Sequence, residues 1–303
     1  MKNSPRKCCS LTAHTAVLFC ACLFLAGCRG RSEQLPPQDT VTPVAPAAST
    51  VIATPPPQPS ATPAGCLETT GRMEWHELPA GAASYVIPFH IYLPPCYDPQ
   101  EGTYPLLVLL HGQSDTSELW MRMGIQLLAD GLINRGEVPP FVILMPTEAY
   151  YLQDFLDSVF GQALFADLLP WMENEYAVST ERTCRALGGI SRGAAWSALL
   201  GIQNWEQFAA IGAHSVPNAP YSEVRLKSLL EEIPAGSMPR IWMDTGDMDR
   251  YRKSAEAFAE LLTRRGVPYE WHLNPGAHEE AYWRAHLEDY LRWYASSWWG
   301  CVN

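Results

Sequence analysis

From residue 85 onward, the chain alternates short apolar runs with longer segments of helical periodicity, and this alternation limits the folds that it can adopt. Continuous apolar runs such as 105–112 (PLLVLLHG) and 141–146 (FVILMP) are typical of strands that are buried on both faces. Strands that alternate with helices favour a mainly parallel sheet with helices on both faces. We therefore predict an α/β fold, in which ligands collect at the carboxyl ends of the strands.

Apolar periodicity and flanking Gly and Pro residues set the expected elements. Segment 71–79 is expected to form a hairpin with 85–94, and Pro170 is expected to bend the helix that contains it. The predicted strands cover 85–94, 105–112, 141–146, 183–190, 207–214, 240–247 and 267–274. The predicted helices cover 117–136, 160–178, 191–203, 254–266 and 279–299.

A serine between two glycines, Gly189-Ile190-Ser191-Arg192-Gly193, falls between the predicted strand 183–190 and the helix that follows it. The pattern G-x-S-x-G in a strand–turn–helix setting is typical of a nucleophile elbow. Its glycines leave room for a sharp turn in which the serine takes an unfavourable backbone angle. Because a serine here could equally be an ordinary N-cap of the helix, the interpretation depends on partners elsewhere in the chain.

A serine hydroxyl is a weak nucleophile near neutral pH and needs a base. Among the eight histidines, His278 alone lies in a loop after the last predicted strand, where an imidazole can reach Ser191. The orienting acid is expected just after the preceding strand, which offers Asp244, Asp247 and Asp249. Asp244 lies within the strand, and we favour Asp249 over Asp247. The order Ser191…Asp249…His278 is that of the α/β-hydrolase triad.

Several segments resemble the esterase family of α/β-hydrolases that includes esterase D and the feruloyl esterases. The matching segments are 92–112, 167–178, 187–194, the turn Gly246–Asp249, and 274–287, which together span most of 85–290. The resemblance implies an α/β-hydrolase fold and ester hydrolysis through an acyl-serine, without a metal or an organic cofactor. It also implies an oxyanion hole made by the backbone N–H groups of Gln113 and Arg192.

The sequence departs from that family at Arg192, where many relatives carry an apolar residue. The Arg192 side chain could meet an acidic group of the substrate or pair with a nearby carboxylate, and we favour the second. Ala194 stands where Gly is frequent, a change that we expect to be harmless. The aromatic residues expected to surround the site, unless they pack in the core, are Trp120, Tyr150, Tyr151 and His214.

Substrate identity stays open at this point. Feruloyl or acetyl esters of polysaccharides fit an exported esterase, and small-molecule esters fit the same chemistry. The family also contains acyltransferases and siderophore esterases. The competing class is a binding lipoprotein that kept the fold without catalysis. The formal net charge of −11 and the lack of a Lys/Arg cluster argue against nucleic acid as a partner.

The N-terminal segment 1–27 has the form of a signal peptide, with Lys2, Arg6 and Lys7 ahead of a short apolar core. Its end, Leu25-Ala26-Gly27-Cys28, resembles the lipobox of bacterial lipoproteins, which implies lipidation of Cys28 and export to a membrane-anchored position at the cell surface or the periplasmic face. A plain secretory signal and an uncleaved anchor are the alternatives. Residues 28–65 are predicted to be a Pro-rich tether, and 66–303 the esterase domain.

Four cysteines follow Cys28, and an even number in an exported protein favours two disulfides. Cys66 precedes the first strand of the expected hairpin and Cys96 follows the second, so antiparallel pairing brings them together. Cys184 begins the strand that leads to Ser191, and the final helix returns to that end of the sheet before Cys301. We therefore predict Cys66–Cys96 and Cys184–Cys301, with four free thiols as the alternative.

Overall fold

The computed structural model describes residues 66–81, 85–155, 157–218 and 222–302. The expectations for the signal peptide, for Cys28 and for the tether lie outside the described residues. Within the described part of the chain, no helix combines the length and the apolar character needed to cross a membrane.

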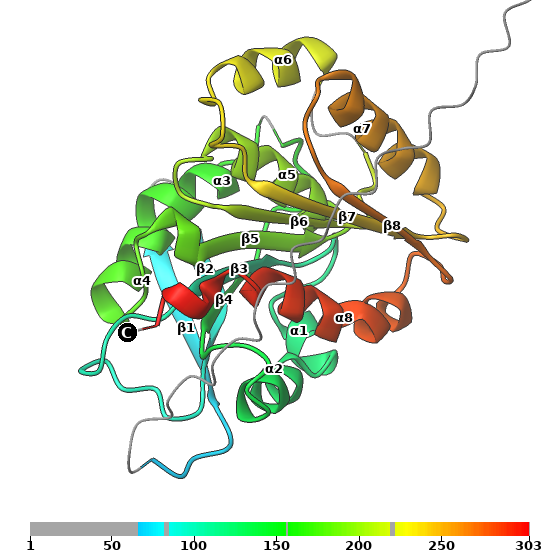
Figure 1. Ribbon diagram of the computed structural model, residues 1–303. Coiled ribbons are helices and arrows are strands. Elements are labelled where there is room, and N and C mark those ends of the chain that lie inside the picture. The colour runs from blue at the N-terminus through cyan, green and yellow to red at the C-terminus, as the bar shows by residue number, and fades with distance from the viewer. Residues whose placement is uncertain (1–65, 82–84, 156, 219–221, 303) are drawn as a thin grey trace, which may run out of the picture. The chain divides into compact units, whose positions relative to one another are not determined.

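An eight-stranded sheet forms the centre of the domain, with the strand order β1-β2-β4-β3-β5-β6-β7-β8 (Figure 1). β1 and β2 form the expected antiparallel hairpin, and β2 pairs antiparallel with β4. Every neighbouring pair from β4 to β8 is parallel, which confirms the predicted fold class. The strands are β1 (Arg72–Ala80), β2 (Tyr85–Leu93), β3 (Leu106–Leu110), β4 (Val142–Pro146), β5 (Arg185–Ile190), β6 (Ala210–His214), β7 (Arg240–Gly246) and β8 (Glu270–Asn274).

Helices cover both faces of the sheet, with α1, α2 and α8 on one side and α3, α5 and α7 on the other (Figure 1). The helices are α1 (Glu118–Arg122), α2 (Ile125–Asn134), α3 (Phe160–Ala163), α4 (Leu169–Glu175), α5 (Arg192–Gln203), α6 (Glu223–Glu231), α7 (Arg252–Arg264) and α8 (Glu280–Ala295). A π-helical segment, η1 (Leu164–Leu168), joins α3 to α4.

The buried strand β3 shows why its sequence is apolar throughout. Leu106, Val108 and Leu110 pack in the core beneath α5 and α7, whereas Leu107 and Leu109 pack in the opposite core with α2 and α8. Successive side chains of a strand point to opposite faces, so a strand covered on both faces must be apolar at every position.

Two helical expectations differ from the structure. The predicted helix 117–136 is broken at Gly124, whose φ of +87° ends α1 and starts α2 in a new direction. The helix α6 was not predicted, although Ser222 caps it by accepting the N–H of Arg225. Pro170 lies in a helical run that continues from α3 through η1 into α4, and the π-helical segment directly precedes it. Its missing N–H is accommodated where the backbone hydrogen-bond pattern changes.

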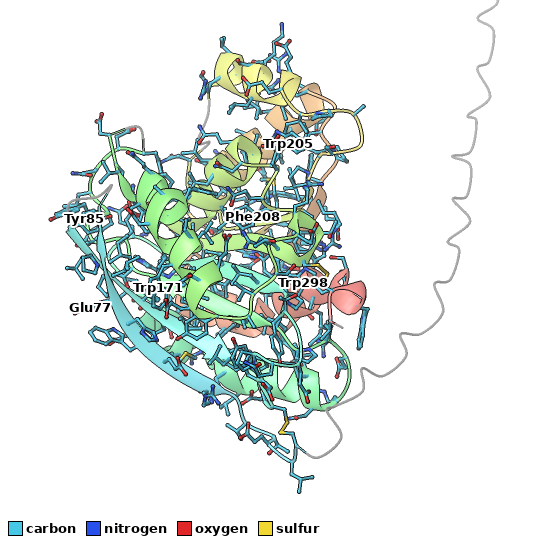
Figure 2. All side chains as sticks on the ribbon, turned by 90° about the vertical axis from the view of Figure 1, so that its left-hand side faces the viewer. Glu77, Tyr85, Trp171, Trp205, Phe208 and Trp298 are labelled. Atoms are coloured by element: carbon cyan, nitrogen blue, oxygen red, sulfur yellow. A yellow bond between two sulfur atoms is a disulfide. The ribbon has the colours of Figure 1, made fainter. Side chains whose placement is uncertain are left out.

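Figure 2 shows two tryptophans, Trp171 and Trp298, that come from segments far apart in the sequence. Trp171 of α4 lies over the hairpin, with its ring 5.1 Å from that of Phe89. Trp298, next to the C-terminal end of α8, is fully buried against Phe141. Aromatic packing therefore fixes both α4 and the segment after α8 to the core.

Both predicted disulfides are present. Cys66 is joined to Cys96 across 30 residues, and Cys184 is joined to Cys301 across 117 residues. The first closes the base of the hairpin, and the second fixes the start of β5 to the segment after α8. Their presence confirms the strand and helix directions from which the pairing was predicted.

Removal of the longer disulfide should cost more stability than removal of the shorter one. Chain-entropy arguments assign about 5 kcal/mol to the Cys184–Cys301 link and about 3.5 kcal/mol to Cys66–Cys96. Denaturant unfolding of the C184S/C301S and C66S/C96S double variants, each compared with the unchanged protein, measures both losses. Equal losses, or a larger loss for the shorter loop, would contradict this ranking.

Candidate active site

Ser191 lies at the sharp turn between β5 and α5. Its φ of +52° and ψ of −118° are strained for a residue with a side chain. The chain passes so closely here that a Cβ on Gly189 would lie 2.4 Å from the Gly193 carbonyl. A Cβ on Gly193 would lie 2.1 Å from the Leu110 oxygen. Both glycines of the motif are therefore required by the turn.

The Ser191 hydroxyl does not cap the helix that it precedes, because no cap hydrogen bond is formed by its side chain. Ser191 Oγ instead lies 2.8 Å from Nε2 of His278. The other ring nitrogen, Nδ1, lies 2.8 Å from Oδ2 of Asp249. The structure thus brings together the serine, imidazole and carboxylate that were expected from the carboxyl ends of β5, β7 and β8, in the arrangement of a catalytic triad.

The carboxylate of Asp249 is buried and accepts several hydrogen bonds. Its Oδ1 accepts the Tyr251 N–H at 2.7 Å. Burial alone would raise the pKa of Asp249. Hydrogen bonds from His278, the Tyr251 N–H and Ser215 outweigh burial and hold that pKa below its usual value. Asp249 is therefore a carboxylate near neutral pH, as a group that stabilises an imidazolium must be.

Asp247, the alternative acid, does not touch the histidine. It is exposed, and its Oδ1 accepts the N–H of Gly276 at 3.0 Å. Asp247 therefore holds the loop that carries His278. The structure places Asp249, and not Asp247, against the imidazole.

The imidazole of His278 is held between two aromatic rings. The ring centroids of Tyr251 and Trp283 lie 4.8 Å and 5.1 Å from it, both in edge-on geometry. The Trp283 indole N–H also donates to Ser215 Oγ at 3.0 Å, and Ser215 in turn bonds Asp249. These contacts restrict the rotation of His278 and connect its packing to the position of the acid.

The proposed oxyanion loop follows β3 and begins at His111. Gln113 and Arg192 both line the pocket that contains Ser191. Arg192 is the first residue of α5, and the first N–H groups of a helix have no intrahelical acceptor. Gly112 passes close to Ser191, since a Cβ placed on it would lie 3.5 Å from Cβ of the serine. The loop after β3 and the start of α5 therefore both border Ser191.

Two hydrogen bonds fix the tautomer of His111. Nδ1–H donates to the Gly112 carbonyl at 2.7 Å, and Nε2 accepts the Glu148 N–H at 2.8 Å. Burial lowers the pKa of His111, which favours the neutral ring that these partners require.

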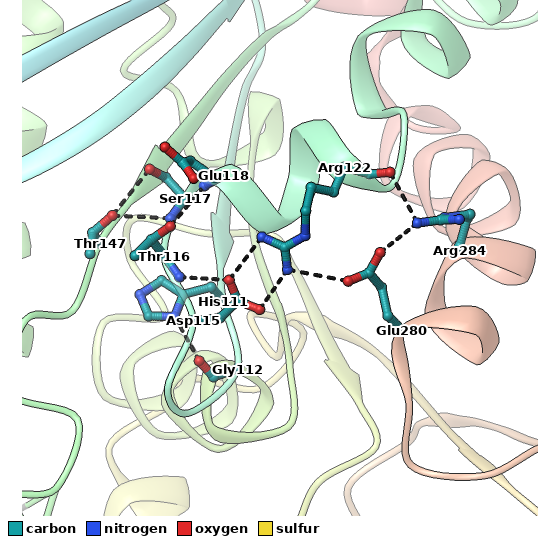
Figure 3. A network of polar contacts seen from close by, with 10 residues as sticks. All are labelled: His111, Gly112, Asp115, Thr116, Ser117, Glu118, Arg122, Thr147, Glu280 and Arg284. Atoms are coloured by element: carbon teal, nitrogen blue, oxygen red, sulfur yellow. Dashed lines mark hydrogen bonds and ion pairs between the residues drawn. The ribbon is translucent and has the colours of Figure 1, made fainter.

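Figure 3 shows the rest of this loop, where Arg122 pairs with Asp115 and with Glu280 of α8. The loop is therefore fastened to three parts of the fold.

The side chain of Arg192 points away from the reacting atoms. Its Nε and terminal nitrogen donate to both oxygens of Glu148 at 2.7 Å and 2.6 Å. The indole N–H of Trp196 donates to the same carboxylate at 2.9 Å. Arg192 also donates to the Gln153 carbonyl, and it lies 4.5 Å from the ring centroid of Phe155. Of the two interpretations of Arg192, pairing with a nearby carboxylate agrees with the structure.

A cavity of about 450 Å³ opens above Ser191. This volume falls in the range of small-ligand pockets. Besides the serine, the histidine and the oxyanion loop, its walls include Leu119, Phe155, Pro217, Asn218, Arg250, Tyr251 and Trp283. The walls therefore combine apolar and aromatic surface with a few polar groups.

Trp120 and His214 do not surround this pocket, contrary to expectation. Trp120 is fully buried in the core on the α2 and α8 side, and its neighbour Leu119 faces the pocket instead. His214 is buried below Ser191, where Nδ1 lies 2.6 Å from Asp244 and Nε2 lies 2.8 Å from the Tyr294 hydroxyl. Only its backbone reaches the site, because the His214 carbonyl accepts the Ser191 N–H at 2.9 Å.

Tyr150 and Tyr151 are also absent from the pocket walls. Tyr150 is half exposed and packs edge-on against Tyr85 of the hairpin, with centroids 4.9 Å apart. The loop after β4 does contribute an aromatic ring to the pocket, but the ring belongs to Phe155. The expectation was therefore correct for the loop and wrong for the residues.

The sequence held a signal for some of the pocket residues that were not predicted. Arg250 and Tyr251 directly follow the acid, and Trp283 follows His278 by five positions. Phe155 and Asn218 lie in loops without periodicity, where sequence patterns give no side-chain direction.

One group of possible metal ligands occurs among the described residues, formed by Cys66, Glu68 and Cys96. Both of its sulfur atoms are joined in a disulfide. A disulfide sulfur is not the thiolate that binds metals, so this group does not fit a metal ion.

Known proteins resemble the chain across this site. The family described as Putative esterase matches residues 84–294, which include all the residues of the pocket. The chain belongs to this esterase family. An endo-1,4-beta-xylanase/feruloyl esterase of Xylanibacter ruminicola is 27% identical over 214 residues, which are 66% of this chain and 28% of that protein. The chain thus spans little more than a quarter of that relative.

Solved structures of esterases share the fold of this family member. A ferulic acid esterase superposes with a TM-score of 0.66 at 22% identity, covering 75% of this chain and 99% of that one. The feruloyl esterase module of Clostridium thermocellum, complexed with sinapinate, gives a TM-score of 0.64 at 17% identity. It covers 78% of this chain and 92% of that one. These likenesses establish the α/β-hydrolase fold.

Proposed function

We propose that this protein is a serine esterase that hydrolyses carboxylic esters through an acyl-serine intermediate. The observation that carries the proposal is the 2.8 Å contact between Ser191 Oγ and His278 Nε2, made by a serine at a strained turn. A buried serine whose hydroxyl does not cap the helix, and whose Oγ faces an imidazole oriented by a carboxylate, has the features of an activated nucleophile.

In the proposed reaction, His278 removes the proton of Ser191 as Oγ attacks the ester carbonyl carbon. The N–H groups of Gln113 and Arg192 stabilise the oxyanion, and Asp249 stabilises the imidazolium. The imidazolium then gives its proton to the leaving alcohol as the C–O bond breaks. Water, deprotonated by the same imidazole, attacks the acyl-serine and releases the carboxylic acid and free Ser191.

Feruloyl or acetyl esters of polysaccharides are the substrates that we favour. The support is the family itself, a relative named for feruloyl esterase activity, and a similar structure solved with sinapinate. A pocket of about 450 Å³ walled by Leu119, Phe155 and Trp283 is large enough for an aromatic acyl group.

A hydrolysis panel tests this proposal. Purified protein is assayed against p-nitrophenyl acyl esters, methyl ferulate and acetylated xylan, and labelling by a fluorophosphonate is followed in parallel. We expect turnover of at least one ester and labelling on Ser191. Absence of both turnover and labelling in folded protein would favour the competing class, a non-catalytic binding protein.

We further propose that the protein is exported and held at a membrane by lipid on Cys28. The support is the sequence, in which a basic start, a short apolar core and Leu-Ala-Gly-Cys precede a Pro-rich segment. In this arrangement the esterase domain would stand off the membrane and reach substrates too large to enter the cell.

The lipid proposal predicts a change of phase in detergent partitioning. Full-length protein from a bacterial host should enter the detergent phase, and C28A should move to the aqueous phase because it has no thiol to acylate. C66S serves as the control, since it also removes a cysteine but leaves the lipobox unchanged. An aqueous wild-type protein whose N-terminus is not Cys28 would contradict the proposal.

A further inference from the structure

Among the described charged residues that line the pocket, one has no ion-pair partner. Arg192 is neutralised by Glu148 at 2.6 Å, and Asp115 is neutralised by Arg122 at 2.8 Å. Arg250, which lines the same pocket, forms no ion pair with any residue of the described chain. It is exposed, so its guanidinium keeps its donors free for a ligand.

An aromatic ring holds Arg250 on the pocket side. Its guanidinium carbon lies 4.9 Å from the ring centroid of Tyr251, and that ring packs edge-on against His278 at 4.8 Å. These two contacts place the guanidinium within about 10 Å of the imidazole, comparable to the Debye length at 0.1 M salt. One small ester molecule bound at Ser191 can therefore also contact Arg250.

Because the net charge of the protein is negative, the positive charge of Arg250 matters more for the binding of an anionic ligand. With a formal charge of −11, the chain as a whole repels anions. A free arginine at the mouth of the nucleophile pocket supplies a local attraction for a carboxylate, which guanidinium binds with two parallel hydrogen bonds.

We propose that Arg250 selects ester substrates that carry a carboxylate near the scissile bond, on either the acyl or the alcohol part. This inference rests on the proposed esterase function and identifies a specificity residue for it. Arg250 binds the carboxylate of the substrate and so raises kcat/KM for anionic esters relative to neutral esters of the same size.

Matched substrate pairs measure this preference. For the acyl part, p-nitrophenyl hemiglutarate is compared with p-nitrophenyl pentanoate. For the alcohol part, 4-carboxyphenyl acetate is compared with 4-carbamoylphenyl acetate. For each pair, the kcat/KM of the anionic ester is divided by that of the neutral ester. This ratio is then compared between the variant and the wild type, and the comparison cancels the intrinsic reactivity of the esters.

R250Q should lower the anionic-to-neutral ratio about tenfold in at least one pair, as expected for the loss of one charge-assisted contact at a solvated site. R250K should retain part of the ratio. R252Q is the matched control because Arg252 is two residues away but pairs with Glu256 at 2.7 Å. Its ratio should stay within about twofold of wild type. The pair that responds identifies which side of the ester carries the carboxylate.

The outcomes separate this inference from the esterase proposal. If neutral esters are hydrolysed and R250Q leaves the ratio of both pairs unchanged, the assignment of Arg250 is wrong while the esterase proposal stands. If R250Q and R252Q lower the ratio equally, the effect is long-range electrostatics and the assignment is also wrong. If no ester is hydrolysed by the wild type, the esterase proposal itself fails.

Discussion

Replacement of Ser191 by alanine is expected to lower kcat for any accepted ester by about four to six orders of magnitude. In the proposed mechanism the alanine removes the oxygen that attacks the ester, so the residual rate would come from substrate binding and from the proposed oxyanion hole. The turn should survive, because the strained φ of +52° belongs to the backbone and alanine adds no bulk. Circular dichroism and the thermal midpoint check that the variant is folded.

The matched control for this prediction is S197A in α5, the helix that follows Ser191. The Ser197 hydroxyl is fully buried and donates to the Gly212 carbonyl at 2.7 Å, outside the pocket. Its removal should cost about 1 kcal/mol of stability and leave kcat within a few-fold of wild type. Activity of S191A within tenfold of wild type, measured on protein free of wild-type contamination, would show that Ser191 is not the nucleophile.

Asp249→Asn is expected to lower kcat about 10⁴-fold while the fold is retained. Asparagine has nearly the same shape, but it carries no charge to stabilise the imidazolium, and its amide can donate to Nδ1. That contact would favour the tautomer with hydrogen on Nε2, which cannot accept the proton of Ser191. KM should change much less than kcat, because Asp249 is not expected to touch the substrate.

Asp247→Asn provides the comparison, because Asp247 lies two residues earlier and is not in contact with His278. The asparagine side chain can still accept the Gly276 N–H that Asp247 now accepts at 3.0 Å. Its kcat should therefore remain within about threefold of wild type. A severe loss in D247N with a mild loss in D249N would reverse the assignment of the acid.

The sequence was sufficient to predict the parallel sheet, the segments that converge at its carboxyl edge, and both disulfides. Each of these depends on chain direction, which alternating strands and helices determine. Ser191, Asp249 and His278 follow three parallel strands, so they had to meet at one edge. Cys184 and Cys301 lie at the opposite edge for the same reason.

Side-chain direction was harder to predict than position. His214 ends the strand β6 as expected, but its ring points below the sheet, where it stacks on Tyr290 at 3.6 Å and bonds Asp244. Trp120 and Leu119 are adjacent in α1, and about 100° of helical rotation decides which of them faces the pocket. That rotation depends on the break at Gly124, which the periodicity of 117–136 did not reveal.

The disulfide between Cys184 and Cys301 also determines what happens to the protein after proteolysis. The serine, the acid and the histidine all lie between Cys184 and Cys301, in the ring that this disulfide closes. One cut anywhere in that ring yields two fragments that stay covalently joined, and neither can diffuse from the folded core. A secreted protease would have to cut the ring twice, or cleave after a thiol reductant has acted, before it could separate the serine from its partners. If the protein is exported as proposed, a single nick between the two cysteines therefore breaks the main chain without releasing a fragment.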